Sequence, residues 1–99
     1  MTGESSQVYE IISGNFELEE VKEITIEEIQ KILTARIREM LDTNLEKLLH
    51  ILYRIDVSQK KTDVIFNSPF KDEIAEDLAA AVIERQLEKI ETRKKYSSK

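Results

Sequence analysis

An all-α fold is predicted for this chain by its helix-start signals, its apolar periodicity and its shortage of helix-breaking residues. The 99 residues include only two glycines and one proline, so few positions interrupt a helix. Apolar residues recur at spacings of three and four, which is the period of a helix buried on one face. A sheet fold would need more turn residues than these. We therefore expect a compact bundle of three to four helices with an irregular acidic N-terminal arm.

Three regions are expected along the chain, around a single core. Residues 1–24 form the irregular arm, because their apolar residues sustain neither the helix nor the strand period. Residues 25–95 form the helical domain, and residues 96–99 form a disordered basic tail. The net charge of −5 is unevenly distributed: residues 1–30 hold eight acidic side chains and one basic one, whereas residues 89–99 hold five basic and one acidic.

The first helix of the domain is predicted to begin after Thr25. Thr25 and Glu28 match the capping box T-x-x-E, in which each side chain satisfies an amide of the first turn. One apolar stripe then follows as far as Leu41, formed by Ile26, Ile29, Leu33, Ile37 and Met40. These signals together predict a helix over residues 25–41.

A second helix is predicted from Leu45 to Ile55, because Thr43 and Glu46 repeat the capping-box pattern. Apolar residues cover more than half of its circumference, and its polar strip is narrow. A helix that is apolar over so much of its surface is usually packed on two sides. It is therefore either the central helix of the domain or a helix shared with a second subunit.

Two further helices complete the predicted domain. Ser58 can cap a short helix that ends near Phe66. Ser68 followed by Pro69 is typical of a helix start, since proline lacks only an amide hydrogen that is unpaired there anyway. The last helix is expected to run from Pro69 to about Lys94.

The last helix carries two apolar stripes. The first is formed by Phe70, Ile74, Ala75, Leu78, Ala81 and Val82, and the second by Ile83, Leu87 and Ile90. We expect the second stripe to be an interface, with a homodimer or another protein covering it. In the alternative, Phe16, Leu18 and Val21 fold the N-terminal arm back over the stripe.

Asp56 and Arg85 are the two charges that the helical periods place on apolar faces. Asp56 falls between Leu45 and Leu49, and Arg85 falls on the first stripe of the last helix. Opposite charges that share a core are tolerated as a pair. Asp56 is therefore expected to pair with Arg85, or else to cap the third helix. Both interpretations give it a structural role.

No residue pattern assigns a catalytic, cofactor-binding or metal-binding group. Cysteine is absent, so thiolate nucleophiles and cysteine zinc sites are excluded. His50, the single histidine, lies on a polar strip and lacks the second histidine of an H-E-x-x-H site. No serine lies in a Gly-x-Ser-x-Gly elbow, and neither glycine belongs to a phosphate-binding loop. We expect no enzyme and no cofactor.

The remaining partner classes are limited by charge and hydropathy. Residues 1–10 carry neither the basic start nor the apolar run of a secretory signal, and no stretch is long and apolar enough to cross a bilayer. A cytoplasmic protein without a membrane partner is therefore expected. The tail TRKKYSSK could contact nucleic acid, but cations of this kind also complete a helix, and we expect no nucleic-acid partner.

The run LLHILYRIDVS, with IERQLEKIETRKK near the end of the chain, resembles a small uncharacterised group of short bacterial helical proteins over residues 40–95. The resemblance implies a helical fold and supplies no activity. The leading expectation for function is a non-catalytic protein-interaction or self-associating module. The alternatives are a nucleic-acid-associated domain that uses the basic tail, and third, a small enzyme with a pocket around Asp56.

Overall fold

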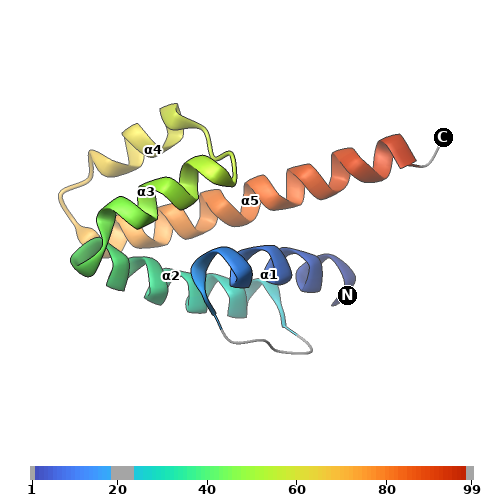
Figure 1. The fold of residues 1–99 in the computed structure, drawn as a ribbon, viewed down its shortest axis with the longest axis horizontal. Coiled ribbons are helices and arrows are strands. Elements are labelled where there is room, and N and C mark those ends of the chain that lie inside the picture. The colour runs from blue at the N-terminus through green and yellow to red at the C-terminus, as the bar shows by residue number, and fades with distance from the viewer. Residues whose placement is uncertain (1, 19–23, 98–99) are drawn as a thin grey trace.

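The computed structural model describes residues 2–18 and 24–97, and every regular element in this part of the chain is a helix (Figure 1). The predicted all-α fold is therefore confirmed. The helices are α1 (Thr2–Phe16), α2 (Ile26–Thr43), α3 (Leu45–Arg54), α4 (Gln59–Phe66) and α5 (Lys71–Ser97). The structure has one helix more than the predicted three to four, because α1 occupies the expected arm.

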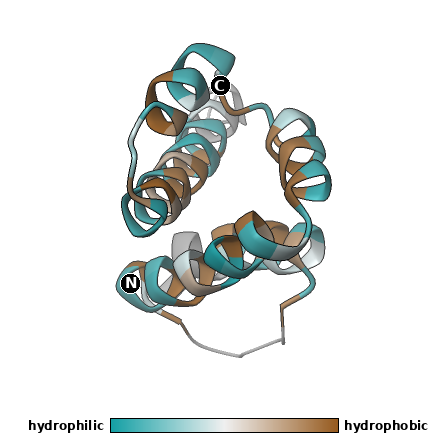
Figure 2. Ribbon diagram, turned by 90° about the vertical axis from the view of Figure 1, so that its left-hand side faces the viewer, coloured by the Kyte–Doolittle hydropathy of each residue, from teal (hydrophilic) through white to brown (hydrophobic). Residues whose placement is uncertain are grey.

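Helix α5 is the longest element, and α1, α2 and α4 all pack against it. Figure 1 shows α3 and α4 toward the N-terminal half of α5, with α2 and α1 on its other side. Polar and apolar residues alternate along each helix (Figure 2), as expected for helices that bury one face. The bundle is elongated, with extents of 44 × 28 × 19 Å.

The core lies mainly between α2 and α5. The buried residues of α2 are those of its predicted stripe: Ile29, Leu33, Ile37 and Met40. The buried residues of α5 include two alanines, Ala75 and Ala79, beside the larger Leu78 and Val82. Because alanine side chains are short, a neighbouring helix can approach the backbone of α5 closely at these positions.

The start of α2 confirms the predicted capping box. The amide of Glu28 donates to Thr25 Oγ1 at 3.1 Å, and the amide of Thr25 donates to Glu28 Oε1 at 3.0 Å. The predicted box at Thr43 is wrong, because α2 continues through Thr43, whose hydroxyl donates to the carbonyl of Glu39 at 2.9 Å. Asn44 caps α3 instead, accepting the amide of Lys47 at 3.2 Å.

The bounds of the last two helices differ slightly from those predicted. Ser58 precedes α4 as expected but makes no side-chain cap hydrogen bond. Helix α5 begins at Lys71, two residues after Pro69, and the Ser68 hydroxyl accepts the amide of Phe70 at 3.3 Å. Since α5 continues to Ser97, the predicted disordered tail is wrong for residues 96 and 97, while residues 98 and 99 lie outside the described part.

The predicted irregular arm is wrong over residues 2–16, which form α1. Its buried residues Val8, Ile12 and Phe16 are spaced four apart, so they lie on one face and join the core. Ser13-Gly14-Asn15 is helical and does not form the turn that its residue types indicate. The side chains of Ser13 and Asn15 donate hydrogen bonds to carbonyls of the preceding helical turn. The Ser13 hydroxyl donates to the carbonyl of residue 10 at 3.2 Å, and the Asn15 amide to that of residue 11 at 2.9 Å.

Replacing Phe16 with alanine tests whether α1 belongs to the folded domain. Phe16 is fully buried, so Phe16→Ala should lower the free energy of unfolding by about 3–5 kcal/mol. Val64→Ala is the matched control, because Val64 is 71% exposed and its loss should cost less than about 0.5 kcal/mol. Urea denaturation followed by circular dichroism measures both. Equal stability of the two variants would show that α1 does not dock.

Candidate functional site

Asp56 lies in the turn that ends α3, and its φ of 68° places it in the left-handed region. The amide of Val57 donates to the carbonyl of Leu52 at 3.1 Å, and the amide of Asp56 donates to that of Tyr53 at 3.2 Å. These two bonds form a Schellman motif, whose left-handed position is usually a glycine. Aspartate is one of the few other residues that tolerate this conformation.

Three side chains of α5 bind the end of α3. Arg85 donates through Nε to the carbonyl of Asp56 at 3.1 Å and through a terminal nitrogen to its Oδ2 at 2.9 Å. The carbonyl of Ile55 accepts from Gln86 Nε2 at 3.4 Å and from Lys89 Nζ at 3.1 Å. Donors and cations here satisfy the free carbonyls and the negative end of the helix.

The predicted pairing of Asp56 with Arg85 is present, while the predicted burial of the pair is wrong. The two side chains are 69% and 36% exposed. Helix α3 ends at Arg54, and the left-handed turn places Asp56 outside the apolar arc that a continued helix would give it. The hydrogen bond from Arg85 lowers the pKa of Asp56, and the nearby charges of Arg85 and Lys89 lower it further.

The hollow beside Asp56 has a volume of about 300 Å³. Arg85 of α5 bonds Asp56 in the turn after α3 and Glu88 on its own helix, and Lys61 of α4 pairs with Glu84 of α5. These pairs join α3, α4 and α5. The geometry therefore favours the structural interpretation of Asp56 and Arg85.

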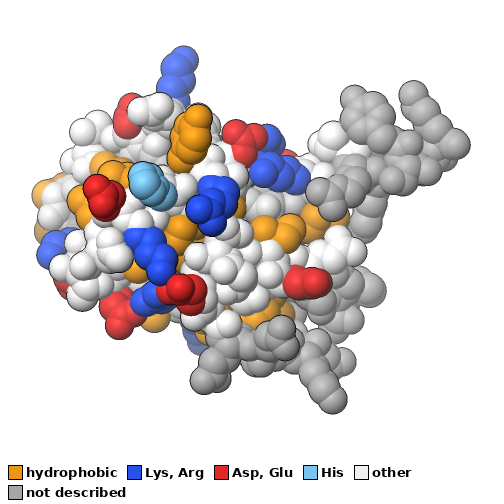
Figure 3. All heavy atoms as spheres, in the orientation of Figure 1, with side chains coloured by type: hydrophobic (Ala, Val, Ile, Leu, Met, Phe, Trp, Pro, Cys, Tyr) orange, Lys and Arg blue, Asp and Glu red, His pale blue; other side chains and the backbone are white. Residues whose placement is uncertain are grey.

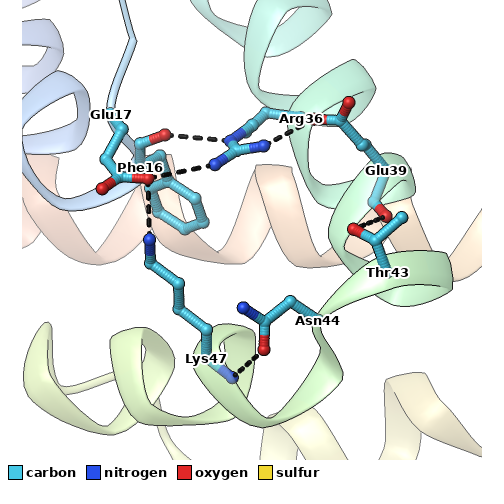
Figure 4. Close-up of polar contacts among 7 residues, drawn as sticks. All are labelled: Phe16, Glu17, Arg36, Glu39, Thr43, Asn44 and Lys47. Atoms are coloured by element: carbon cyan, nitrogen blue, oxygen red, sulfur yellow. Dashed lines mark hydrogen bonds and ion pairs between the residues drawn. The ribbon is translucent and has the colours of Figure 1, made fainter.

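A second polar cluster, absent from the sequence-based predictions, joins α1, α2 and α3 (Figure 4). Arg36 Nε donates to the carbonyl of Phe16 at 3.0 Å, and a terminal nitrogen pairs with Glu17 at 3.3 Å. Lys47 Nζ donates to the same Glu17 oxygen at 2.7 Å, and this bond lowers the pKa of Glu17. Glu17 also has a positive φ, of 58°, and the amide of Leu18 donates to the carbonyl of Ser13 at 3.0 Å.

His50 is exposed on α3 (Figure 3), as predicted from its polar strip. Among the side chains that the structure describes, in residues 7–18 and 24–92, no three His, Asp or Glu side chains gather into a group that could hold a metal ion. Among the helices that the structure describes, none has the apolar length that crossing a bilayer requires.

The predicted interface at Ile83, Leu87 and Ile90 is not a free surface. Ile83 and Ile90 are each 4% exposed and belong to the core, and Leu87 is half-buried against it. Helix α1 packs on α5, and Phe16 is fully buried. Whether Phe16 itself covers this stripe stays a prediction. Leu18 also packs against the core, whereas Val21 lies outside the described residues.

Helix α3 exposes a different apolar surface, formed by Leu45, Leu49 and Tyr53 and called here the α3 face. These side chains are 44%, 45% and 88% exposed. They are spaced four apart and so form one row, while Leu48, Ile51 and Leu52 bury the opposite side of the helix. The extended apolar surface predicted for this helix thus has a buried half and an open half.

A groove of about 280 Å³ runs beside the α3 face, between α3 and α4. Apolar side chains from both helices and the connecting turn line it: Leu49, Leu52, Tyr53, Val57 and Phe66. Gln59, Thr62 and Asp63 supply its polar groups. A groove that is mostly apolar, with a few polar groups, suits a side chain of a binding partner.

Comparisons with protein-family models, curated proteins and solved structures find no match to this chain. The resemblance of residues 40–95 to short bacterial helical proteins stays a prediction.

Substitutions at Asp56 separate its backbone role from its ion pair. Asp56→Ala loses the pair and puts an unsuited residue at a positive φ, so its melting temperature should fall by a few degrees. Asp56→Gly loses the same pair but suits the turn, and should melt close to the wild type. Differential scanning calorimetry provides the measurement. Equal melting of the alanine and glycine variants would contradict the left-handed turn.

The Glu17 cluster predicts a loss of stability in acid. Because the pKa of Glu17 is lower in the folded state than in the unfolded state, ionised Glu17 stabilises the fold. This stabilisation is present at pH values above the unfolded-state pKa of about 4.3, and it is lost as the pH falls through the folded-state pKa. Glu17→Gln should therefore reduce the dependence of melting temperature on pH below about 4.3. Glu76→Gln, at a carboxylate without an ion pair to any described residue, should leave that dependence unchanged. Identical pH profiles for all three proteins would refute the assignment.

Proposed function

We propose that this chain is a non-catalytic protein-interaction module that binds through the α3 face and the adjoining groove. The observation that carries the proposal is the row of Leu45, Leu49 and Tyr53, exposed side by side on one helix. Single exposed apolar residues are common on protein surfaces, but contiguous ones mark interaction sites. Tyr53, which is 88% exposed, has one of the side-chain types that are enriched among the residues that dominate binding at interfaces.

Burial of this surface by a partner would contribute favourable free energy to binding. Full burial of a large apolar side chain contributes about 1.5–3 kcal/mol, and the three side chains of the α3 face retain a large part of that area in contact with water. The groove adds apolar area from Phe66 of α4. Because α4 packs on α5 and the end of α3 is hydrogen-bonded to it, the surface is held in shape before a partner binds.

The chemistry of the surface favours a protein partner over nucleic acid. Phosphate recognition needs a concentration of basic side chains, and the α3 face offers apolar ones. The adjoining polar row is mixed in sign, with Glu46 at one end and Arg54 at the other. A protein surface with an apolar centre and a mixed polar rim matches both features.

Site-specific photo-cross-linking in the living host cell tests the proposed function. A benzoylphenylalanine residue at position 53 should yield a discrete protein adduct, and Leu49→Glu should remove most of it, because a carboxylate cannot be buried there without a partner. The same probe at Asp77, an exposed position of α5, is the matched control. An adduct at position 53 no stronger than that at position 77 would refute the proposal.

A further inference from the structure

We infer that the partner of the α3 face is the α3 face of a second copy of this chain, packed antiparallel about a two-fold axis near Leu49 and His50. The inference rests on the proposed function and names its partner. It follows from the order of charges beside the apolar row, where Glu46, His50 and Arg54 form a parallel row one residue further along.

The two rows select one register. In an antiparallel pair of identical helices, a two-fold axis places opposite one another the residues that lie equally far along the helix on either side of it. An axis between Leu49 and His50 lies within one residue, a rise of about 1.5 Å, of the centre of both rows. It therefore brings Leu49 close to its own copy and Leu45 close to the partner copy's Tyr53. In the neighbouring row, it brings His50 close to its copy and Glu46 close to the partner copy's Arg54. Each copy thus supplies one acid and one base to two equivalent ion pairs.

Glu46 and Arg54 are available for these pairs. Both are exposed, and neither forms an ion pair with another residue in the part of the chain that the structure describes. They lie eight residues apart, or about 12 Å along the helix, which is too far for them to pair with each other. A parallel arrangement would instead place each charge against an identical one, so the charge order favours the antiparallel dimer.

The groove extends the apolar contact beyond the α3 row. It lies beside Leu49 and Tyr53, where the antiparallel register brings the partner copy's Leu45. A cavity of about 150 Å³ can hold benzene, so a groove of about 280 Å³ has room for a leucine side chain. The two-fold axis repeats this contact, because each copy presents both the groove and the leucine.

Charge-reversal variants test both whether the partner is a second copy of the chain and whether Glu46 of one copy faces Arg54 of the other. In Glu46→Arg, arginine faces the partner copy's Arg54, and in Arg54→Glu, glutamate faces the partner copy's Glu46. Each variant alone should dimerise roughly tenfold more weakly than the wild type, because two attractive contacts become repulsive. An equimolar mixture of the two should form heterodimers, and the double variant Glu46→Arg/Arg54→Glu should recover the wild-type dimer.

Sedimentation velocity and native mass spectrometry on the full chain at tens of micromolar give the readout, and circular dichroism confirms that each variant is folded. Glu76→Arg makes the same charge change on α5 and should leave the dimer intact. A monomeric wild type, or a mixture that forms no heterodimer, would overturn the inference. A monomeric wild type that still cross-links from position 53 to another protein would overturn the second copy while supporting the proposed function.

Discussion

The attachment of the α3 C-terminus to α5 is the interaction on which the rest of the arrangement depends. The last carbonyls of a helix have no partner within it, and here Arg85, Gln86 and Lys89 supply donors from a helix about 30 residues further along the chain. This contact sets the direction of α3, and with it the direction of the α3 face. It also fixes the turn at Asp56. Because α4 follows this turn, the contact sets how far α4 lies from α3, and so the width of the groove between them.

The parts of the fold that could be predicted from sequence are those set by local signals. The stripe from Ile29 to Met40 and the capping box at Thr25 act within a few residues, so they are visible in the sequence and are present in the structure. Helix α1 was missed because its turn-like Ser13-Gly14-Asn15 segment becomes helical when Val8, Ile12 and Phe16 dock on the core. That contribution comes from residues distant in sequence, and a local pattern does not contain it.

The polar contacts show the same division. Opposite charges on apolar faces indicated that Asp56 would pair with Arg85, but the helix period could not show that α3 ends before Asp56 and leaves the pair exposed. Gln86 and Lys89 bind a backbone carbonyl, which every residue possesses, so no residue pattern indicates their role. The same limit applies to Ile83 and Ile90, because their burial depends on how helices distant in sequence pack against α5.

The two positions with a left-handed backbone are occupied by Glu17 and Asp56, and this affects how the domain folds. Glycine would form such a turn unaided, whereas Glu17 and Asp56 occupy theirs with side chains bonded to other helices. The ends of α1 and α3 therefore gain their full stability only after Lys47 and Arg85 are in place. A bend that depends on contacts with another helix loses its stabilisation when those contacts are lost, so these ends couple the helices into one cooperative unit.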